Sequence, residues 1–184
     1  MLQWFSRRAE ARRRAQELYG SVVTVARQPS FYKDMGVPDT PEGRFELVSL
    51  HLFLALESLN RQRAAELDLT QRTIEAFVTD MDDCMREMGV GDLAVPKKVK
   101  RAAAAFYERA GAYRRGLSEP ENPNLEAVVR KYVFFANPGN DAGVKALVGY
   151  VRKAASKLSA EPFDEHVVGG GLIELLGNDK GEVP

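Results

Sequence analysis

The sequence predicts an all-α fold, a single-domain bundle of about six to eight helices. Apolar side chains recur at spacings of three and four residues along nearly the whole chain, as in helices that bury one face. No segment has the alternation of apolar and polar residues, bounded by hairpin turns, that is typical of strands. With 184 residues, of which 45% are hydrophobic, the chain suits one domain and can bury a core without disulfides or structural metal.

Two long helices are predicted in the first third of the chain. The first runs from about residue 6 to 28 and ends before Pro29, with basic residues at its start and apolar residues after them. The second runs from Thr40 to about Gln62, because the Thr40 hydroxyl can cap free amides and Pro41 fits a first helical turn. It is apolar around most of its circumference, which places it at the centre of the core.

Glycines and prolines separate the remaining predicted helices. These helices cover residues 70–88, 96–115, about 124–136, about 141–158 and a short segment at 162–168. We expect Gly169, Gly170 and Gly171 to stop the last of them. The chain is therefore divided into a basic N-terminal arm (1–14) leading into the first helix, a helical domain (15–176) and a flexible tail (177–184).

The N-terminal arm places apolar residues before basic ones, the reverse of a secretory signal. No apolar run reaches the roughly 18 residues that cross a bilayer. We therefore expect a cytoplasmic protein, with the arm as a candidate peripheral contact at the inner face of the cytoplasmic membrane. The candidate contact residues are Trp4, Phe5, Arg7, Arg8 and Arg12. The alternative is a frayed helix whose arginines are only solvated.

An acidic helix face is the first candidate for a metal site or a pair of catalytic carboxylates. Its members are Glu75, Asp80, Asp82, Asp83 and Glu87. They fall at different angular positions of one helix, and neither a second acidic helix nor an ExxH motif accompanies them. A solvated acidic face is the favoured interpretation, so we predict no metal site.

Other reactive side chains give no catalytic constellation either. His51 lies inside the apolar helix without a ligand partner at helical spacing, which favours a hydrogen-bonded core histidine. Cys84, the single cysteine, cannot form an internal disulfide, and Asp82 and Asp83 are expected to raise its pKa. We predict that the protein is not an enzyme and needs no cofactor.

Charge is segregated along the chain although the net charge is zero, with 26 basic and 26 acidic residues. The first helix and the turn containing Lys97, Lys98, Lys100 and Arg101 are basic, whereas residues 66–92 are mainly acidic. Basic surfaces attract phosphate or acidic partners and acidic surfaces repel nucleic acid, so we expect a module with more than one partner and no DNA among them. Alternatively, the acidic and basic helices are neighbours that neutralise each other.

Four stretches carry a resemblance to a known family. They are FYKDMGVPDTPEGRFE (31–46), FVTDMDD (77–83), REMGVGD (86–92) and VPKKVK (95–100). In this order, over roughly residues 15 to 160, the chain resembles the ubiquinol–cytochrome c chaperone family. The resemblance implies an all-helical, non-enzymatic assembly chaperone for respiratory complex III, which binds newly made cytochrome b at the cytoplasmic face of the membrane. Mitochondrial relatives act with a small partner protein and associate with the ribosome, so both are candidate partners. No mitochondrial presequence is recognisable, and we expect a bacterial member.

A client with transmembrane helices needs an apolar or methionine-lined surface that can repack on different sequences. The candidate client-binding residues are Phe31, Tyr32, Phe77, Met81, Met85 and Met88, for which ordinary core packing is the alternative. The candidate contacts to ribosomal RNA, anionic lipid or an acidic partner are Lys97, Lys98, Lys100 and Arg101. The alternative function is a helical RNA- or ribosome-binding protein without a membrane client, whose affinity would fall steeply with salt.

Overall fold

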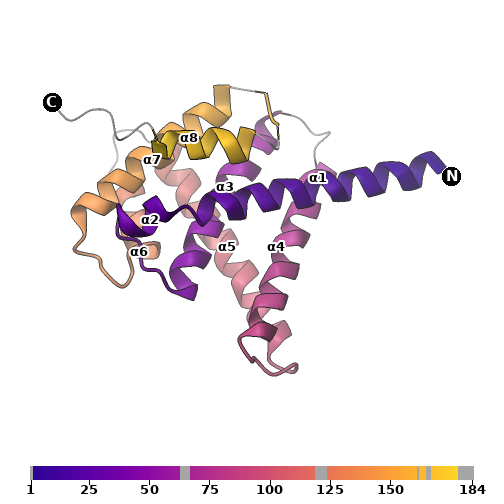
Figure 1. Cartoon of the computed structure of the whole chain (residues 1–184), viewed down its shortest axis with the longest axis horizontal. Coiled ribbons are helices and arrows are strands. Elements are labelled where there is room, and N and C mark those ends of the chain that lie inside the picture. The colour runs from indigo at the N-terminus through magenta and orange to yellow at the C-terminus, as the bar shows by residue number, and fades with distance from the viewer. Residues whose placement is uncertain (1, 63–66, 119–123, 161, 165–166, 178–184) are drawn as a thin grey trace.

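The computed structural model describes residues 2–62, 67–118, 124–160, 162–164 and 167–177, and every regular element in these ranges is helical (Figure 1). The elements are α1 (Leu2–Ala26), α2 (Pro29–Lys33), α3 (Pro41–Gln62), α4 (Leu67–Glu87), α5 (Val95–Ser118), α6 (Asn124–Tyr132), α7 (Asp141–Ala160), the π-helix η2 (Val167–Gly171) and α8 (Leu172–Gly177). The predicted all-α fold is confirmed. Among the described residues, no helix is both long and apolar enough to cross a membrane.

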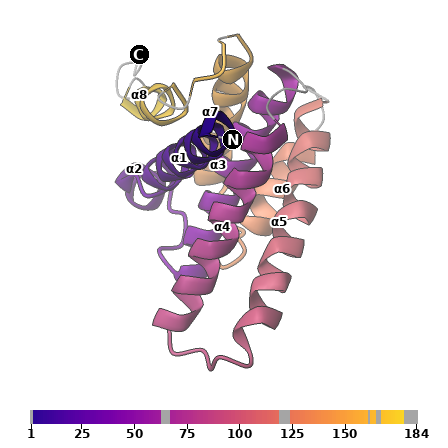
Figure 2. The ribbon, with the colours of Figure 1, turned by 90° about the vertical axis from the view of Figure 1, so that its right-hand side faces the viewer.

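Helix α3 lies at the centre of the core, as its apolar circumference predicts. It packs against α1, α4, α5 and α7. Leu47, Leu50, Leu52 and Leu59 on this helix are completely buried. Figures 1 and 2 show the other helices arranged around α3, with α4 and α5 forming a long hairpin whose connecting loop projects beyond the rest of the molecule.

The start of α3 is built by local hydrogen bonding and a close backbone approach. The Gly43 amide donates to the Thr40 hydroxyl at 3.1 Å, which confirms Thr40 as the capping residue. A Cβ atom on Gly43 would lie 1.9 Å from the Pro38 carbonyl oxygen, so only glycine fits there. The preceding turn is thereby held tightly against the first turn of α3.

The N-terminal arm is helical from Leu2 and continuous with the rest of α1. Figure 1 shows this end of α1 extending away from the other helices. Arg13 pairs with Glu10 and Glu17 on the same helix, and Arg12 is exposed. The side chains of Trp4, Phe5, Arg7 and Arg8 lie outside the part of the chain that the structure describes, so their predicted membrane contact stays a prediction.

The prediction for the end of the chain is wrong in its details. Residues 162–164 are not helical, and Gly169–Gly171 do not stop a helix but lie within η2, which continues into α8. The physical reason is packing against α1: a Cβ atom on Gly169 would lie 3.1 Å from the Ser21 Oγ atom. Gly169 thus allows η2 and α1 to approach closely. Residues 178–184 of the predicted tail lie outside the described residues.

Two further boundaries differ from the prediction. Residues 29–33, which lie between the first two predicted helices, form the short helix α2. Helix α6 ends at Tyr132 instead of near residue 136, because the amides of Val133 and Phe134 both bond the Val129 carbonyl and close a turn. Both of these side chains are completely buried, so burial rather than helical continuation accounts for their apolar character.

Candidate functional site

A groove of about 930 Å³ lies among α1, the first half of α3, the second half of α4 and the first half of α5. We call it the groove throughout. Its apolar lining residues are Val23, Phe45, Val48, Met81, Cys84, Met85, Met88, Ala102 and Ala105. Among the residues that the structure describes, this is a hollow large enough to accept several side chains of another molecule.

The α4 wall of the groove is rich in sulfur. Met81, Cys84, Met85 and Met88 recur at helical spacing and all line the groove. Met81 and Met85 are half-buried, whereas Met88 is 60% exposed. Methionine is unbranched and polarisable, so this wall can adapt to apolar side chains of varied shape.

Tyr32 on α2 also lines the groove, and its hydroxyl donates to the Ala26 carbonyl at 2.9 Å.

The α5 wall is small and basic. Lys98, Arg101, Ala102 and Ala105 line it, at the spacing of one helix face. The two alanines leave room in front of the methionines, and the two cations stand at the first turns of α5. Lys97 and Lys100 are exposed but do not line the groove. The groove therefore collects two of the four predicted cationic contacts.

A buried ion pair lies at the floor of the groove. Arg109 on α5 donates from Nε and Nη2 to the Glu46 carboxylate on α3, at 2.6–2.8 Å. The guanidinium also lies over the Tyr132 ring at 4.6 Å. Burial raises the pKa of Glu46, and the Arg109 charge opposes that shift. The pair ties α3, α5 and α6 together beneath the groove.

Phe31 and Phe77 occupy core positions and do not line the groove. Phe77 lies under it, 6.2 Å from the ring of Phe45, which does line it. Phe31 packs edge-on against His51 and Tyr150. Of the six apolar candidates, the groove brings together Tyr32, Met81, Met85 and Met88, and the two phenylalanines support the fold around it.

His51 is a structural residue, as its sequence context predicts. Its Nδ1 atom lies 2.7 Å from the Leu47 carbonyl, and its Nε2 atom lies 2.8 Å from the Tyr150 hydroxyl. Since a carbonyl only accepts, Nδ1 carries the proton and Nε2 accepts from Tyr150. Complete burial lowers the pKa of His51 to about 4, so the ring is neutral at physiological pH.

The acidic face of α4 does not assemble a metal site. Among the described residues, no group of three histidine, cysteine, aspartate or glutamate side chains could hold a metal ion. Asp80 instead accepts a 2.6 Å hydrogen bond from the Tyr19 hydroxyl. Burial, with Asp80 and Glu87 nearby, raises the pKa of the Cys84 thiol, which disfavours a reactive thiolate. The direction agrees with the prediction, but the cause differs: burial comes first, followed by Asp80 and Glu87 and, more weakly, Asp83, and Asp82 is not among the causes.

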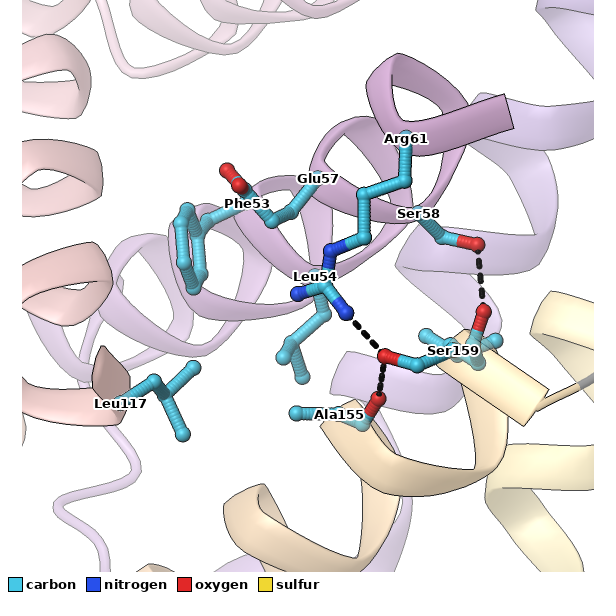
Figure 3. A pocket seen from close by; sticks show the side chains of 9 residues that line it. Phe53, Leu54, Glu57, Ser58, Arg61, Leu117, Ala155 and Ser159 are labelled. Carbon is cyan, nitrogen blue, oxygen red and sulfur yellow. Dashed lines mark hydrogen bonds between the residues drawn. The ribbon is translucent and has the colours of Figure 1, made fainter. Parts of the chain in front are cut away.

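A second hollow, between α3, α5 and α7, encloses only about 10 Å³. Figure 3 shows that hydrogen bonds span it: Arg61 donates to Ser159, and Ser58 donates to the Leu158 carbonyl at 2.8 Å. Phe53 and Leu117 fill its other side (Figure 3). As the described residues form it, this hollow is too small to hold a ligand.

Comparisons with known proteins identify the family of the chain. A family model described as "Ubiquinol-cytochrome C chaperone" matches residues 33–172. The chain belongs to this family. It is 26% identical over 156 residues to the ubiquinol-cytochrome c reductase complex assembly factor 1 of Drosophila melanogaster, an alignment covering 82% of this chain and 60% of that protein. It also resembles the crystal structure of the Cbp3 homolog from Brucella abortus, with 35% identity, a TM-score of 0.77 and coverage of 92% and 93% of the two chains.

The region that matches the family model includes α3, α4 and α5, which supply most of the groove. Glu46, Arg109 and the two wall alanines, Ala102 and Ala105, were not among the predicted site residues. Lys98, Arg101, Ala102, Ala105 and Arg109 recur at three- and four-residue spacing, so the face they share was detectable. The pairing of Glu46 with Arg109 was not detectable from the sequence, because 63 residues separate them.

Proposed function

We propose that this chain is a non-enzymatic assembly chaperone for the ubiquinol–cytochrome c oxidoreductase, complex III. Its client is newly made cytochrome b, held at the cytoplasmic face of the membrane, and the groove is the surface that holds it. The observation that carries the proposal is the large methionine-lined groove in a chain that belongs to the ubiquinol-cytochrome C chaperone family.

The dimensions and lining of the groove suit an apolar helical segment. Its volume of about 930 Å³ is close to the upper end of about 300–1,000 Å³ typical of small-ligand clefts. Apolar and sulfur-containing side chains make up about half of its lining residues, and most of the others are charged. Helix-in-groove recognition uses side chains at positions i, i+3, i+4 and i+7, and flexible methionines accept a range of such anchors. A client that must be held briefly and then released fits this adaptable surface.

The groove also offers charge at its edges, which can orient a client helix. Lys98 and Arg101 stand on the α5 wall, and Glu87 stands on the α4 wall. No ion pair joins these three side chains to a residue of the described chain. A segment bearing an acidic residue on one edge and a basic residue on the other would place both charges opposite partners.

Site-specific photo-crosslinking in cells tests the assignment of the groove. A photoreactive amino acid at Ala102, inside the groove, is expected to crosslink to cytochrome b during its synthesis. The same group at Lys145, exposed on α7 and outside the groove lining, is the matched control and is expected to give no such product. Equal crosslinking from both positions would contradict the groove as the client site.

A deletion strain tests the client itself. Reduced-minus-oxidised spectra of membranes are expected to lose the cytochrome b signal while other cytochromes remain. Complementation with Ala105→Trp, which fills the groove with a large side chain, is expected to restore less cytochrome b than wild type at equal protein level. Normal complex III activity in the deletion strain would contradict cytochrome b as the client.

A further inference from the structure

The loop that joins α4 to α5 exposes apolar side chains at the far end of a projecting hairpin (Figures 1 and 2). We call residues 88–94 the hairpin tip. Leu93 is 100% exposed and Met88 is 60% exposed, which makes them the two most exposed of the large hydrophobic side chains that the structure describes. Two exposed apolar side chains on one protruding tip are available to cover, or to enter, another apolar surface.

The hairpin tip is an ordered turn and not a loose loop. The amides of Gly89 and Val90 donate to the carbonyls of Arg86 and Met85, the paired bonds of a Schellman motif, and Gly89 adopts φ +78° as that motif requires. The Ala94 amide then donates to the Gly91 carbonyl at 2.8 Å. Val95, the next residue, is completely buried and anchors the start of α5. This turn fixes Leu93 in its outward position.

Four cationic side chains lie in the first two turns of α5, immediately after the hairpin tip in the chain. We call Lys97, Lys98, Lys100 and Arg101 the cationic collar. All four are exposed, and none forms an ion pair with another described residue. The nearby acids Asp82 and Asp92 do not compensate the collar, because both bind Arg86. Since cations at a helix N-terminus oppose the helix dipole, local stability does not explain the collar.

The spacing of the hairpin tip and the cationic collar matches the depth of a lipid interface. With a rise of about 1.5 Å per residue, the collar cations lie roughly 3–9 Å along α5 from Val95. The headgroup layer on each side of a bilayer is about 5–8 Å thick. A tip inserted to the level of Leu93 therefore places the collar among the lipid phosphates.

We propose that the hairpin tip docks on the surface of an anionic lipid bilayer, with Leu93 and Met88 in the interface and the cationic collar on the phosphates. Lipid is favoured over RNA because the outward side chains of the tip are aliphatic, whereas RNA recognition relies on aromatic stacking. Met88 belongs both to the tip and to the groove, so docking brings one end of the groove to the membrane surface.

This inference supplies a contact surface for the membrane location in the proposed function. It is tested with purified protein and lipid alone, so its failure would leave client binding in the groove untouched. Conversely, failure of the cytochrome b assignment would leave the lipid contact standing.

Co-sedimentation with vesicles measures the contact. The full chain is expected to bind vesicles of phosphatidylcholine and phosphatidylglycerol and to bind vesicles of phosphatidylcholine alone much less. Leu93→Asp is expected to weaken binding about tenfold. Neutralising Lys97 or Lys100, which lie outside the groove lining, is expected to weaken it about fivefold each. The matched controls are Phe135→Asp, at an exposed aromatic after α6, and Lys145→Gln on α7, both of which should bind as wild type.

Fluorescence separates the hairpin tip from the N-terminal arm. Trp4 is the single tryptophan, so Leu93→Trp combined with Trp4→Phe reports only on the tip. We expect its emission to shift to the blue with anionic vesicles and to be quenched by lipids brominated in the acyl chains. Unshifted emission would overturn the proposal. Vesicle binding that survives Leu93→Asp but is lost on deleting residues 2–8 would overturn it in favour of the arm.

A separate substitution tests RNA, instead of lipid, as the partner of the cationic collar. Tyr107 is 58% exposed on α5 and is the available stacking surface near the collar. We expect Tyr107→Ala to leave vesicle binding unchanged. Failure of the wild-type chain to bind vesicles, together with RNA oligonucleotide binding that Tyr107→Ala weakens, would replace lipid by RNA as the partner of the collar.

Discussion

The two sides of α3 are built differently. On the side facing α2 and α7, Phe31, His51 and Tyr150 interlock, and the hollow further along α3 encloses only about 10 Å³. On the side facing the α4–α5 hairpin, the first half of the same helix borders a groove of about 930 Å³. Aromatic rings fill the first side, which we call the closed side. Methionines and alanines border the second, together with Lys98 and Arg101, which form no ion pair among the described residues.

This difference separates residues that hold the fold from residues available to a partner. A truncation on the closed side removes contacts that nothing replaces, so its cost appears as lost stability. A truncation of an apolar side chain in the groove walls removes contacts that only a bound molecule would complete, so its cost appears as lost binding. The predictions that follow test this division, beginning with the largest expected effect.

Phe31→Ala is expected to reduce the free energy of unfolding by about 4 kcal/mol. Phe31 is completely buried between His51 and Tyr150, and its removal leaves a cavity in the closed side. Met88→Ala, a truncation in the groove, should cost under about 1 kcal/mol because that side chain is largely exposed. Urea unfolding measures both. Similar losses for the two variants would contradict the division.

Breaking the buried pair in the groove floor is the next largest effect. Arg109→Met leaves the Glu46 carboxylate buried without a partner and is expected to cost about 3 kcal/mol. The double variant Arg109→Met with Glu46→Leu should recover most of this loss, because no charge remains buried. Arg114→Met, which breaks a more exposed α3–α5 pair with Glu57, is the control and should cost under about 1 kcal/mol. A double variant no more stable than Arg109→Met would contradict this account.

The pH dependence of stability tests His51 on the closed side. Its pKa is about 4 in the folded chain against an ordinary value of 6.5, so the unfolded chain takes up the proton first as the pH falls. Stability is therefore full above pH 6.5 and is lost progressively down to about pH 4, by about 3 kcal/mol in total.

About 2 kcal/mol of the free energy of unfolding is lost between pH 6.5 and 5. Few carboxylates titrate in this range, so a loss there is assigned to the histidine. Replacing both partners, with His51→Leu and Tyr150→Phe, removes the titrating group without leaving an unpaired hydroxyl. We expect chemical unfolding of this variant to show little pH dependence in that window. A slope equal to that of wild type would assign the effect to other groups.

Local patterns predicted the fold well because most helices have their own signals in the sequence: a residue that favours the start, an apolar face at helical spacing, and a glycine or proline near the end. Thr40 caps α3 as expected, and Gly89 ends α4 in the left-handed conformation. The prediction was wrong where tertiary packing overrides local preference. Gly169 reads as a helix stop in the sequence, but its missing side chain lets η2 approach Ser21 on α1. Such a contact between distant segments leaves no periodic signal.

The candidate site was predictable in part for the same reason. Met81, Met85 and Met88 share a helix face that periodicity reveals, and the structure places all three along the groove. The spacing could not distinguish them from core residues, because Phe77 continues the same stripe and is completely buried. What separates them is the small α5 wall opposite, which only the packing of α4 against α5 reveals.

A double substitution with a small expected effect on stability gives the sharpest test of the methionine wall. Met81→Leu combined with Met85→Leu conserves volume and apolar character, so the free energy of unfolding should change by less than about 1.5 kcal/mol. Leucine lacks the flexible thioether, and we therefore expect weaker crosslinking of cytochrome b to the position at Ala102, with the fold intact. Unchanged stability with unchanged client capture would make Met81 and Met85 ordinary packing residues. The groove would then depend on its shape and its cationic edge instead of on adaptable sulfur side chains.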